Sequence, residues 1–265
     1  MKKIGFVDYY ISEWHANNYP VWIKNLDCGY EVTHVWAELD VSPVDGRTTA
    51  QWCREFGVKA CNTIEELCQT CDVIVVLAPS NPEKHLEYAK EVLKHGKPTY
   101  IDKTFAPNLA EAQEIFDMAK RYHAPFFSTS ALRYADELDA IMGDNNFIIT
   151  GGGSNFPEYC IHLIEMAVKL LNDRVESTNV VCHGDQRICN ISAIGGKKAT
   201  LIYAPKLPFT VASEKADRSS TYVKITSDFF GKLMKDMIRF FETGEVSFDT
   251  NETLEIMKLR DSLLW

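Results

Sequence analysis

The segment formed by residues 71–106 constrains the fold of this chain more than any other stretch. Residues 73–77 and 99–101 are unbroken apolar runs, which are typical of strands buried on both faces of a sheet. Between these runs, Pro82 suits the first turn of a helix and Gly96 suits its end. A strand, a helix and a second strand of this length form a right-handed crossover, so the segment predicts a parallel sheet.

Polar residues follow each of these two strands. Ser80 and Asn81 come after the first strand, and Asp102 and Lys103 come after the second. The carboxyl ends of parallel strands meet at one edge of a sheet, and open α/β sheets bind their ligands at that edge. We therefore expect a binding site there.

Strands and helices alternate along the first half of the chain, and this pattern changes after about residue 130. The apolar runs of the first half predict strands at residues 3–9, 31–39, 73–77, 99–101 and 125–129. The second half predicts a helix at residues 157–171, followed by strands at residues 179–183, 187–194, 199–203, 209–213 and 221–225. We predict a Rossmann-like, doubly wound parallel sheet over residues 1–129, and a smaller α+β domain with a mainly antiparallel sheet over residues 130–265.

Two helix starts carry capping signals. Ser12 is the expected cap of a helix over residues 13–26, which contains Pro20 and therefore either begins at that proline or is kinked. Thr63, with Glu66 three residues later, has the spacing of a capping box.

Composition excludes several classes of protein. The net charge of −9 disfavours a nucleic-acid partner. No stretch reaches the roughly 20 apolar residues of a membrane helix, and the first residues lack a signal-peptide core, so we expect a cytoplasmic protein without a membrane partner. Eight scattered cysteines include one C-x-x-C pair, Cys68 and Cys71, which we interpret as ordinary thiols, so we predict no metal site.

The motifs of residues 71–106 carry a family resemblance. An apolar strand is followed by Pro82 and His85, a Gly-Lys-Pro turn at residues 96–98, and Asp102-Lys103-Thr104. With the continuation over residues 107–133, this pattern resembles the Gfo/Idh/MocA oxidoreductases, whose signature is Glu-Lys-Pro. The resemblance implies a dinucleotide-binding domain, an α/β domain with an open sheet that pairs copies into a homo-oligomer, and NAD(P)-dependent chemistry on small molecules such as sugars and polyols.

The resemblance assigns residues to the chemistry. Lys103 matches the signature lysine beside the nicotinamide and the substrate carbinol. Glu158 and His162 match an acid-x-x-x-His pattern after a glycine run, in which the histidine is the acid/base and the acid orients it; the alternative is a solvated helix face that also includes Glu165 and Lys169. Arg133 and its neighbour Tyr134 are the expected substrate-binding residues, although an arginine at a domain boundary is equally typical of a structural ion pair.

The expected cofactor is NAD, or NADP. The residues predicted to bind it are Asp8, Tyr9, Tyr10, Ile11, Glu38, Ala78, Pro79, Asn81, Asp102 and Lys103. Glu38, near the end of the second strand with Asp40, favours NAD, because an acid there grips a ribose diol and repels a 2′-phosphate.

The turn after the first strand differs from a conventional dinucleotide site. Residues 8–13 read Asp-Tyr-Tyr-Ile-Ser-Glu and hold none of the three glycines of G-x-G-x-x-G. Side chains at these positions block a close approach of pyrophosphate, and Asp8 and Glu13 repel it. Residues 14–19, which include Trp14 and His15, form either a different polar and aromatic binding surface or rings that simply pack.

Two functions follow from these observations. The first is an oxidoreductase that transfers hydride between a nicotinamide cofactor and an alcohol carbon. The alternative is a non-catalytic relative, a sensor or partner subunit, that binds a small ligand and has lost conventional dinucleotide binding. The fold and Lys103 favour the enzyme, and the turn at residues 8–13 favours the alternative.

Overall fold

The computed structural model describes residues 1–264, and the chain divides into two compact units. The first unit contains residues 1–128 and 234–250, and the second contains residues 129–233 and those from 251 onward. The sequence predicted one boundary after residue 129, whereas the chain returns once to the first unit. Trp265, the last residue of the predicted second domain, lies outside the described residues.

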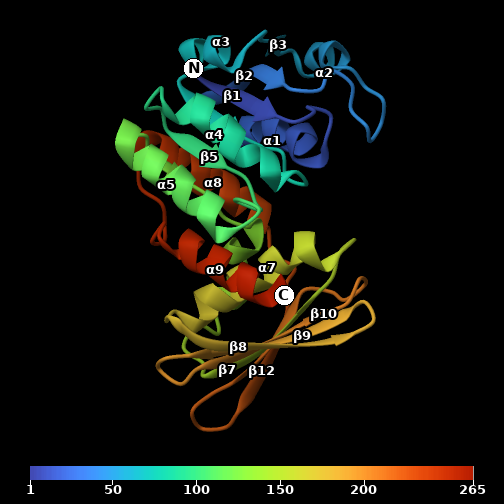
Figure 1. Cartoon of the computed structure of the whole chain (residues 1–265), viewed down its shortest axis with the longest axis vertical. Helices are drawn as coiled ribbons and strands as arrows, with labels where there is room; N and C mark the ends of the chain where they lie inside the picture. The colour runs from blue at the N-terminus through green and yellow to red at the C-terminus, as the bar shows by residue number, and fades with distance from the viewer. Residues whose placement is uncertain (265) are drawn as a thin grey trace. The chain divides into compact units, whose positions relative to one another are not determined.

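The first unit is built on a six-stranded parallel sheet in the order β3-β2-β1-β4-β5-β6. Figure 1 labels β1, β2, β3 and β5 of this sheet. The strands are β1 (Lys2–Asp8), β2 (Tyr30–Ala37), β3 (Lys59–Ala60), β4 (Val73–Val76), β5 (Thr99–Ile101) and β6 (Phe126–Phe127). Strands β1, β4 and β5 occupy the middle of the sheet and bury nearly every side chain, as their apolar runs predicted. The predicted doubly wound parallel sheet is confirmed.

Helices join these strands. They are α1 (Trp14–Asn25), α2 (Thr49–Phe56), α3 (Ile64–Thr70), the 3₁₀ helix η1 (Pro82–Lys84), α4 (His85–Leu93) and α5 (Leu109–Tyr122). The capping box predicted for α3 is half formed, because Thr63 accepts from the Glu66 N–H while the Glu66 carboxylate accepts from Asn62 instead. A complete box caps α2, where Thr48 and Gln51 bond each other's backbone N–H.

Part of helix α8 (Phe229–Thr243) completes the core of the first unit. The Phe240 ring packs edge-on against Phe127 of β6 with 4.8 Å between centroids, and Phe241 lies 6.0 Å from the ring of Tyr30 on β2. Met234 and Met237 are fully buried. The core of the first unit is therefore completed by a helical segment that lies more than 100 residues after β6, the last strand of its sheet.

The second unit contains a six-stranded mixed sheet in the order β12-β11-β7-β10-β9-β8. The strands are β7 (Asn146–Gly151), β8 (Val175–His183), β9 (Gln186–Ala193), β10 (Lys198–Tyr203), β11 (Thr210–Glu214) and β12 (Ser220–Lys224). Only the β7–β10 pair is parallel among the described ladders, so the sheet is mainly antiparallel, as predicted. The helices are η2 (Ala131–Tyr134), α6 (Asp136–Asp139), α7 (Phe156–Leu171) and α9 (Glu252–Leu264).

One face of this second sheet packs on α7, and the other is open. Ile149 and Leu201 point into the core that α7 shares, whereas Ile148 is 48% exposed on the opposite face. Along the stretch that the structure covers, no helix has the length and apolar character needed to cross a membrane.

Candidate active site

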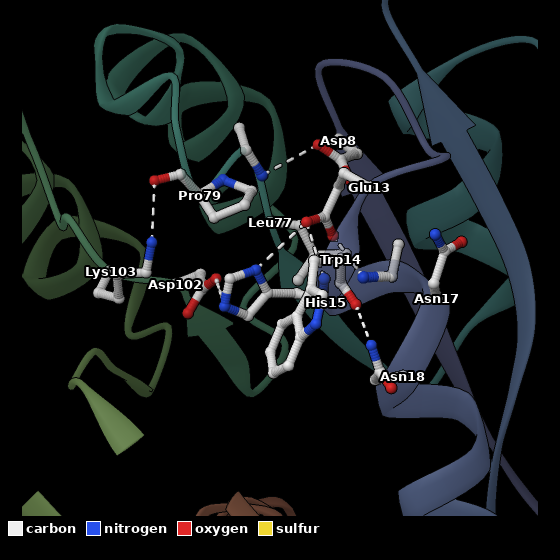
Figure 2. Close-up of polar contacts among 12 residues, drawn as sticks. Asp8, Glu13, Trp14, His15, Asn17, Asn18, Leu77, Pro79, Asp102 and Lys103 are labelled. Atoms are coloured by element: carbon white, nitrogen blue, oxygen red, sulfur yellow. Dashed lines mark hydrogen bonds and ion pairs between the residues drawn. The ribbon is translucent and has the colours of Figure 1, made fainter. Parts of the chain in front are cut away.

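The turn between β1 and α1 is closed by the chain's own carboxylate. Glu13 is the N-cap of α1, and its side chain accepts hydrogen bonds from the backbone N–H groups of His15, at 2.8 Å, and Ala16 (Figure 2). Ser12 was the predicted cap, but its hydroxyl instead donates to Asp45 at 2.7 Å. In Rossmann folds the N-terminus of this helix receives the pyrophosphate. Here Glu13 supplies the negative charge.

Asp8 ends β1 and lies beneath this turn. Its side chain is 1% exposed, and its Oδ1 accepts from the backbone N–H of Tyr9 at 2.7 Å and of Ala78 at 3.0 Å. Burial, and then the neighbouring Glu13 charge, raise the pKa of Asp8 well above its usual range. The second carboxylate oxygen, Oδ2, is buried without a hydrogen-bond partner among the described residues.

His15 links Glu13 to the end of β5. Its Nδ1 lies 3.2 Å from Glu13 Oε2, and its Nε2 lies 3.7 Å from Asp102 Oδ2 (Figure 2). Asp102 is buried and accepts the Tyr100 hydroxyl at 2.9 Å through Oδ1. His15 was predicted only as part of an alternative binding surface. The signal for its pairing was the spacing of two residues from Glu13 at the start of a helix.

Lys103 follows Asp102 at the same edge of the sheet. The Lys103 side chain is buried, and its Nζ donates to the Pro79 carbonyl at 3.2 Å (Figure 2). The Lys103–Thr104 peptide bond is cis, a form that is otherwise found mainly before proline. Ala78, just after β4, has φ +60°, a left-handed conformation that brings its N–H to Asp8.

His85 ties these two strand ends together. Its ring nitrogens contact the Leu77 carbonyl after β4 and the Phe105 carbonyl after β5. The ring is fully buried, and burial lowers the pKa of His85 despite these contacts. The predicted residues Asp8, Ala78, Pro79, Asp102 and Lys103 thus lie on connected elements of one edge.

Glu38, the expected ribose ligand, is hydrogen bonded to two side chains of this chain. Its carboxylate accepts from Lys84 Nζ and from the Tyr88 hydroxyl, both at 2.7 Å. These hydrogen bonds lower the pKa of Glu38, although burial opposes them. The Lys84 ammonium also lies 5.2 Å from the centroid of the Tyr9 ring.

Ile11, Asn81 and Tyr10, which were also predicted to bind the cofactor, differ in burial and in their contacts. Ile11 is buried, and Asn81 donates to the exposed Glu83 at 2.8 Å. Tyr10 lies 5.9 Å from the Tyr9 ring, centroid to centroid. The rings that follow pack on one another, with Trp14 edge-on to Trp22 at 5.6 Å and His15 edge-on to Tyr19 at 5.4 Å. Trp14 is nevertheless half exposed, so the packed rings also form part of the surface.

The residues of this turn do not fit a dinucleotide held in the conventional place. The two backbone donors at the α1 N-terminus are taken by Glu13, and Asp8 lies at the end of the preceding strand. Glu38 is hydrogen bonded within the chain as well. The groups that bind pyrophosphate and ribose in a Rossmann fold are thus already hydrogen bonded to other residues of this chain.

In the second unit, His162 lies on α7 and contacts Ser130. His162 Nδ1 is 2.7 Å from Ser130 Oγ, and the rings of Tyr159 and Phe209 lie edge-on to the imidazole at 5.6 and 5.8 Å. Glu158, one turn earlier, accepts from the Asn155 side chain at 3.0 Å. Lys103 belongs to the first unit and His162 to the second.

Glu165 lies at the centre of a buried ion network. It is 3% exposed and accepts from the Ser130 N–H at 2.9 Å and from Arg133 Nε at 3.1 Å. Arg133 also pairs with Glu252, and its backbone carbonyl accepts from Lys169 at 2.7 Å. These contacts match the ion-pair alternative for Arg133, and the solvated-face alternative for α7 is wrong at Glu165. Tyr134 is half-buried at the end of η2.

Comparisons with known proteins found similar sequences and similar structures. A sequence model described as "Oxidoreductase family, NAD-binding Rossmann fold" (Gfo/Idh/MocA) matches residues 24–130, which begin after the β1–α1 turn. An uncharacterized oxidoreductase of Escherichia coli, YhhX, is 39% identical over 57 residues, or 22% of this chain, and the matched segment spans 16% of that relative's length.

Solved structures match the whole fold at low identity. UDP-N-acetylglucosamine 3-dehydrogenase from Acidithiobacillus ferrooxidans has a TM-score of 0.76 at 11% identity, covering 98% of this chain and 96% of its own. Biliverdin reductase from Synechocystis, in complex with biliverdin and NADP⁺, has a TM-score of 0.77 at 14% identity, covering 99% and 98%. Such likeness shows the fold. The sequence match over residues 24–130 makes this part of the chain similar to the Gfo/Idh/MocA oxidoreductase family.

Proposed function

We propose that the chain is an oxidoreductase acting on an alcohol carbon of a sugar, a polyol or a related small molecule, with a nicotinamide cofactor as the hydride partner that its family implies. The observation that carries the proposal is the placement of Lys103. Lys103 comes just after β5 and directly follows the buried Asp102, at the edge of the sheet where Rossmann folds bind ligands. The sugar-nucleotide dehydrogenase among the structural relatives supports this substrate class.

The chain's own residues have distinct roles in this proposal. The Lys103 ammonium donates a hydrogen bond to the substrate oxygen and stabilises the negative charge that develops there. Arg133 stabilises the second unit through its ion pairs with Glu165 and Glu252.

Cofactor binding requires a rearrangement of the β1–α1 turn. Because Glu13 holds the backbone donors at the start of α1, its carboxylate has to leave them before a pyrophosphate can take that place. Glu38 supports NAD over NADP, since a 2′-phosphate near this carboxylate is repelled.

The second candidate function is binding of a small hydroxyl-bearing ligand without redox chemistry. The observation that favours it is the pair of buried carboxylate oxygens, Asp8 Oδ2 and Asp102 Oδ2, that have no hydrogen-bond partner in the described part of the chain. Ligand hydroxyl groups are donors that can satisfy such acceptors.

Fluorescence titration of the purified protein with NADH and NADPH separates the two candidates. The oxidoreductase proposal predicts saturable NADH binding, followed by substrate-dependent reduction of NAD⁺ when a panel of polyols and sugars is supplied. No binding up to millimolar cofactor, together with calorimetric heat from one of the polyols or sugars alone, supports the second candidate instead.

We also propose that the chain forms a homo-oligomer through the open face of its second sheet. Ile148 and Tyr222 are exposed there on either side of Ala212, to which both are paired in the ladder. Sedimentation equilibrium measures the state directly. Ile148→Lys should weaken association, whereas a monomeric wild-type chain contradicts the proposal.

A further inference from the structure

The open face of the second sheet carries a group of apolar side chains. Ile148 and Tyr222 are 48% and 67% exposed there. Ile202 of β10 faces the same side, because its register partner lies two residues from Ile148 along β7, and Ile188 of β9 is paired with Ile202. Apolar side chains gathered on one exposed face are typical of a surface that binds another protein.

Two opposite charges lie symmetrically about β7 on this face. Lys198 on β10 and Glu214 on β11 are both register partners of Asn146 on β7, and β7 lies between those two strands. Each charge is therefore one strand spacing, about 4.8 Å, to one side of Asn146. Both side chains are exposed, and Glu214 accepts from Asn146 Nδ2 at 2.8 Å. Neither charge forms an ion pair within the described residues.

The surface between these charges is hollowed. A hollow of about 610 Å³ is lined by Lys198, Glu214 and Ile148, together with short side chains such as Thr200 and Ala212. The short side chains leave room over the middle of the sheet, and the two charged side chains come from the strands on either side of β7. A partner surface on this face therefore meets a positive charge on one side of β7 and a negative charge on the other.

The position of the charges selects one way of pairing two copies. When two identical sheets pack face to face about a two-fold axis, the axis lies in the plane between them. An axis that runs along β7 exchanges the two sides of the sheet, so it places Lys198 of one copy over Glu214 of the partner subunit, and does so twice. An axis that crosses the strands at Asn146 instead places each charge over its own copy, where like charges repel.

We propose that two copies of this chain pair through the open face about a two-fold axis along β7, with Lys198 of each copy bonded to Glu214 of the partner subunit. Aligned sheets pack about 10 Å apart, a gap that a lysine and a glutamate can bridge together. Ile148 lies on β7, two residues from Asn146, so it meets its own copy on the axis and forms an apolar centre beside the ion pairs. The inference rests on the homo-oligomer proposed above and adds its symmetry and its paired residues.

Sedimentation equilibrium of the intact chain at constant ionic strength tests this arrangement without cofactor or substrate. Lys198→Glu turns both ion pairs of the dimer into like-charge contacts, and so does Glu214→Lys. Each variant alone should therefore associate at least roughly tenfold more weakly than the wild type. An equimolar mixture of the two variants should regain association, because every charge faces an opposite charge in the mixed dimer. The double variant, whose net charge equals that of the wild type, should regain it as well.

Lys120→Glu is the matched control, since it reverses an exposed lysine on α5 of the first unit and should leave association unchanged. Circular dichroism confirms that each variant is folded. A dimer that tolerates both single reversals, or a mixture that associates no better than either variant alone, overturns the two-fold arrangement. A monomeric wild-type chain overturns the homo-oligomer as well, and absence of cofactor binding or turnover contradicts only the proposed reaction.

Discussion

Replacing Glu13 should strengthen the binding of NADH. The Glu13 carboxylate occupies two backbone donors at the start of α1 and adds a charge where a pyrophosphate has to lie. One close like-charge pair costs about 1 kcal/mol in water and more where water is excluded. Glu13→Gln removes the charge but keeps an acceptor at the cap, so we expect roughly tenfold tighter binding, which corresponds to about 1.4 kcal/mol.

Glu13→Gly removes both the charge and the side chain that covers the donors. It should therefore bind NADH more tightly than Glu13→Gln, because the freed N–H groups can bond a phosphate oxygen. Glycine at an N-cap costs only a few tenths of a kcal/mol relative to a good cap, so the variant should stay folded. The assay is fluorescence titration with NADH at constant ionic strength.

Glu91→Gln, an exposed carboxylate change on α4, is the control and should leave the affinity unchanged. Two outcomes refute the reasoning: wild-type protein that binds NADH at micromolar concentration, or a Glu13→Gly variant that binds more weakly than wild type. The first result shows that Glu13 does not block the cofactor, and the second shows that Glu13 assists its binding.

The other predictions concern buried charges and the edge of the first sheet. The raised pKa of Asp8 means that the folded chain retains a proton that the unfolded chain releases, so the stability that Asp8 contributes is fully present below its unfolded pKa, near 4, and is lost as pH rises through the folded value. Asp8→Asn should flatten this dependence and raise stability at neutral pH, as measured by urea unfolding at several pH values. Glu165→Ala leaves Arg133 and a backbone N–H in the interior with fewer partners and should cost about 3–5 kcal/mol of unfolding free energy, against less than about 0.5 kcal/mol for the exposed Glu91→Ala; equal losses contradict the network. Lys103→Met should abolish turnover and spare NADH affinity, and turnover equal to that of the exposed-site control Lys90→Met removes Lys103 from the reaction.

Local signals in the sequence were sufficient for much of the first unit. The apolar runs placed β4 and β5. Because the carboxyl ends of parallel strands share an edge, the positions of Asp102 and Lys103 followed from strand order alone. These features depend on neighbours in the sequence or on the general geometry of a parallel sheet.

Features that depend on distant contacts were not predicted. Ser12 was the expected cap of α1, but a partner 33 residues away, Asp45, takes its hydroxyl, and Glu13 caps the helix instead. Glu165 is spaced as part of a solvated helix face, yet Arg133, 32 residues earlier, pairs with it in the interior. Strand β3 is only two exposed residues long and has no apolar run to mark it.

The return of the chain to the first unit has a consequence for its synthesis on the ribosome. Residues 1–128 emerge first, but the buried methionines and phenylalanines of α8 emerge more than 100 residues later. Until then, apolar side chains such as Phe127 lack the α8 side chains against which they pack in the folded protein. The nascent Rossmann sheet can therefore reach its final stability only after most of the second sheet has been translated, so the late completion of this unit follows from chain order.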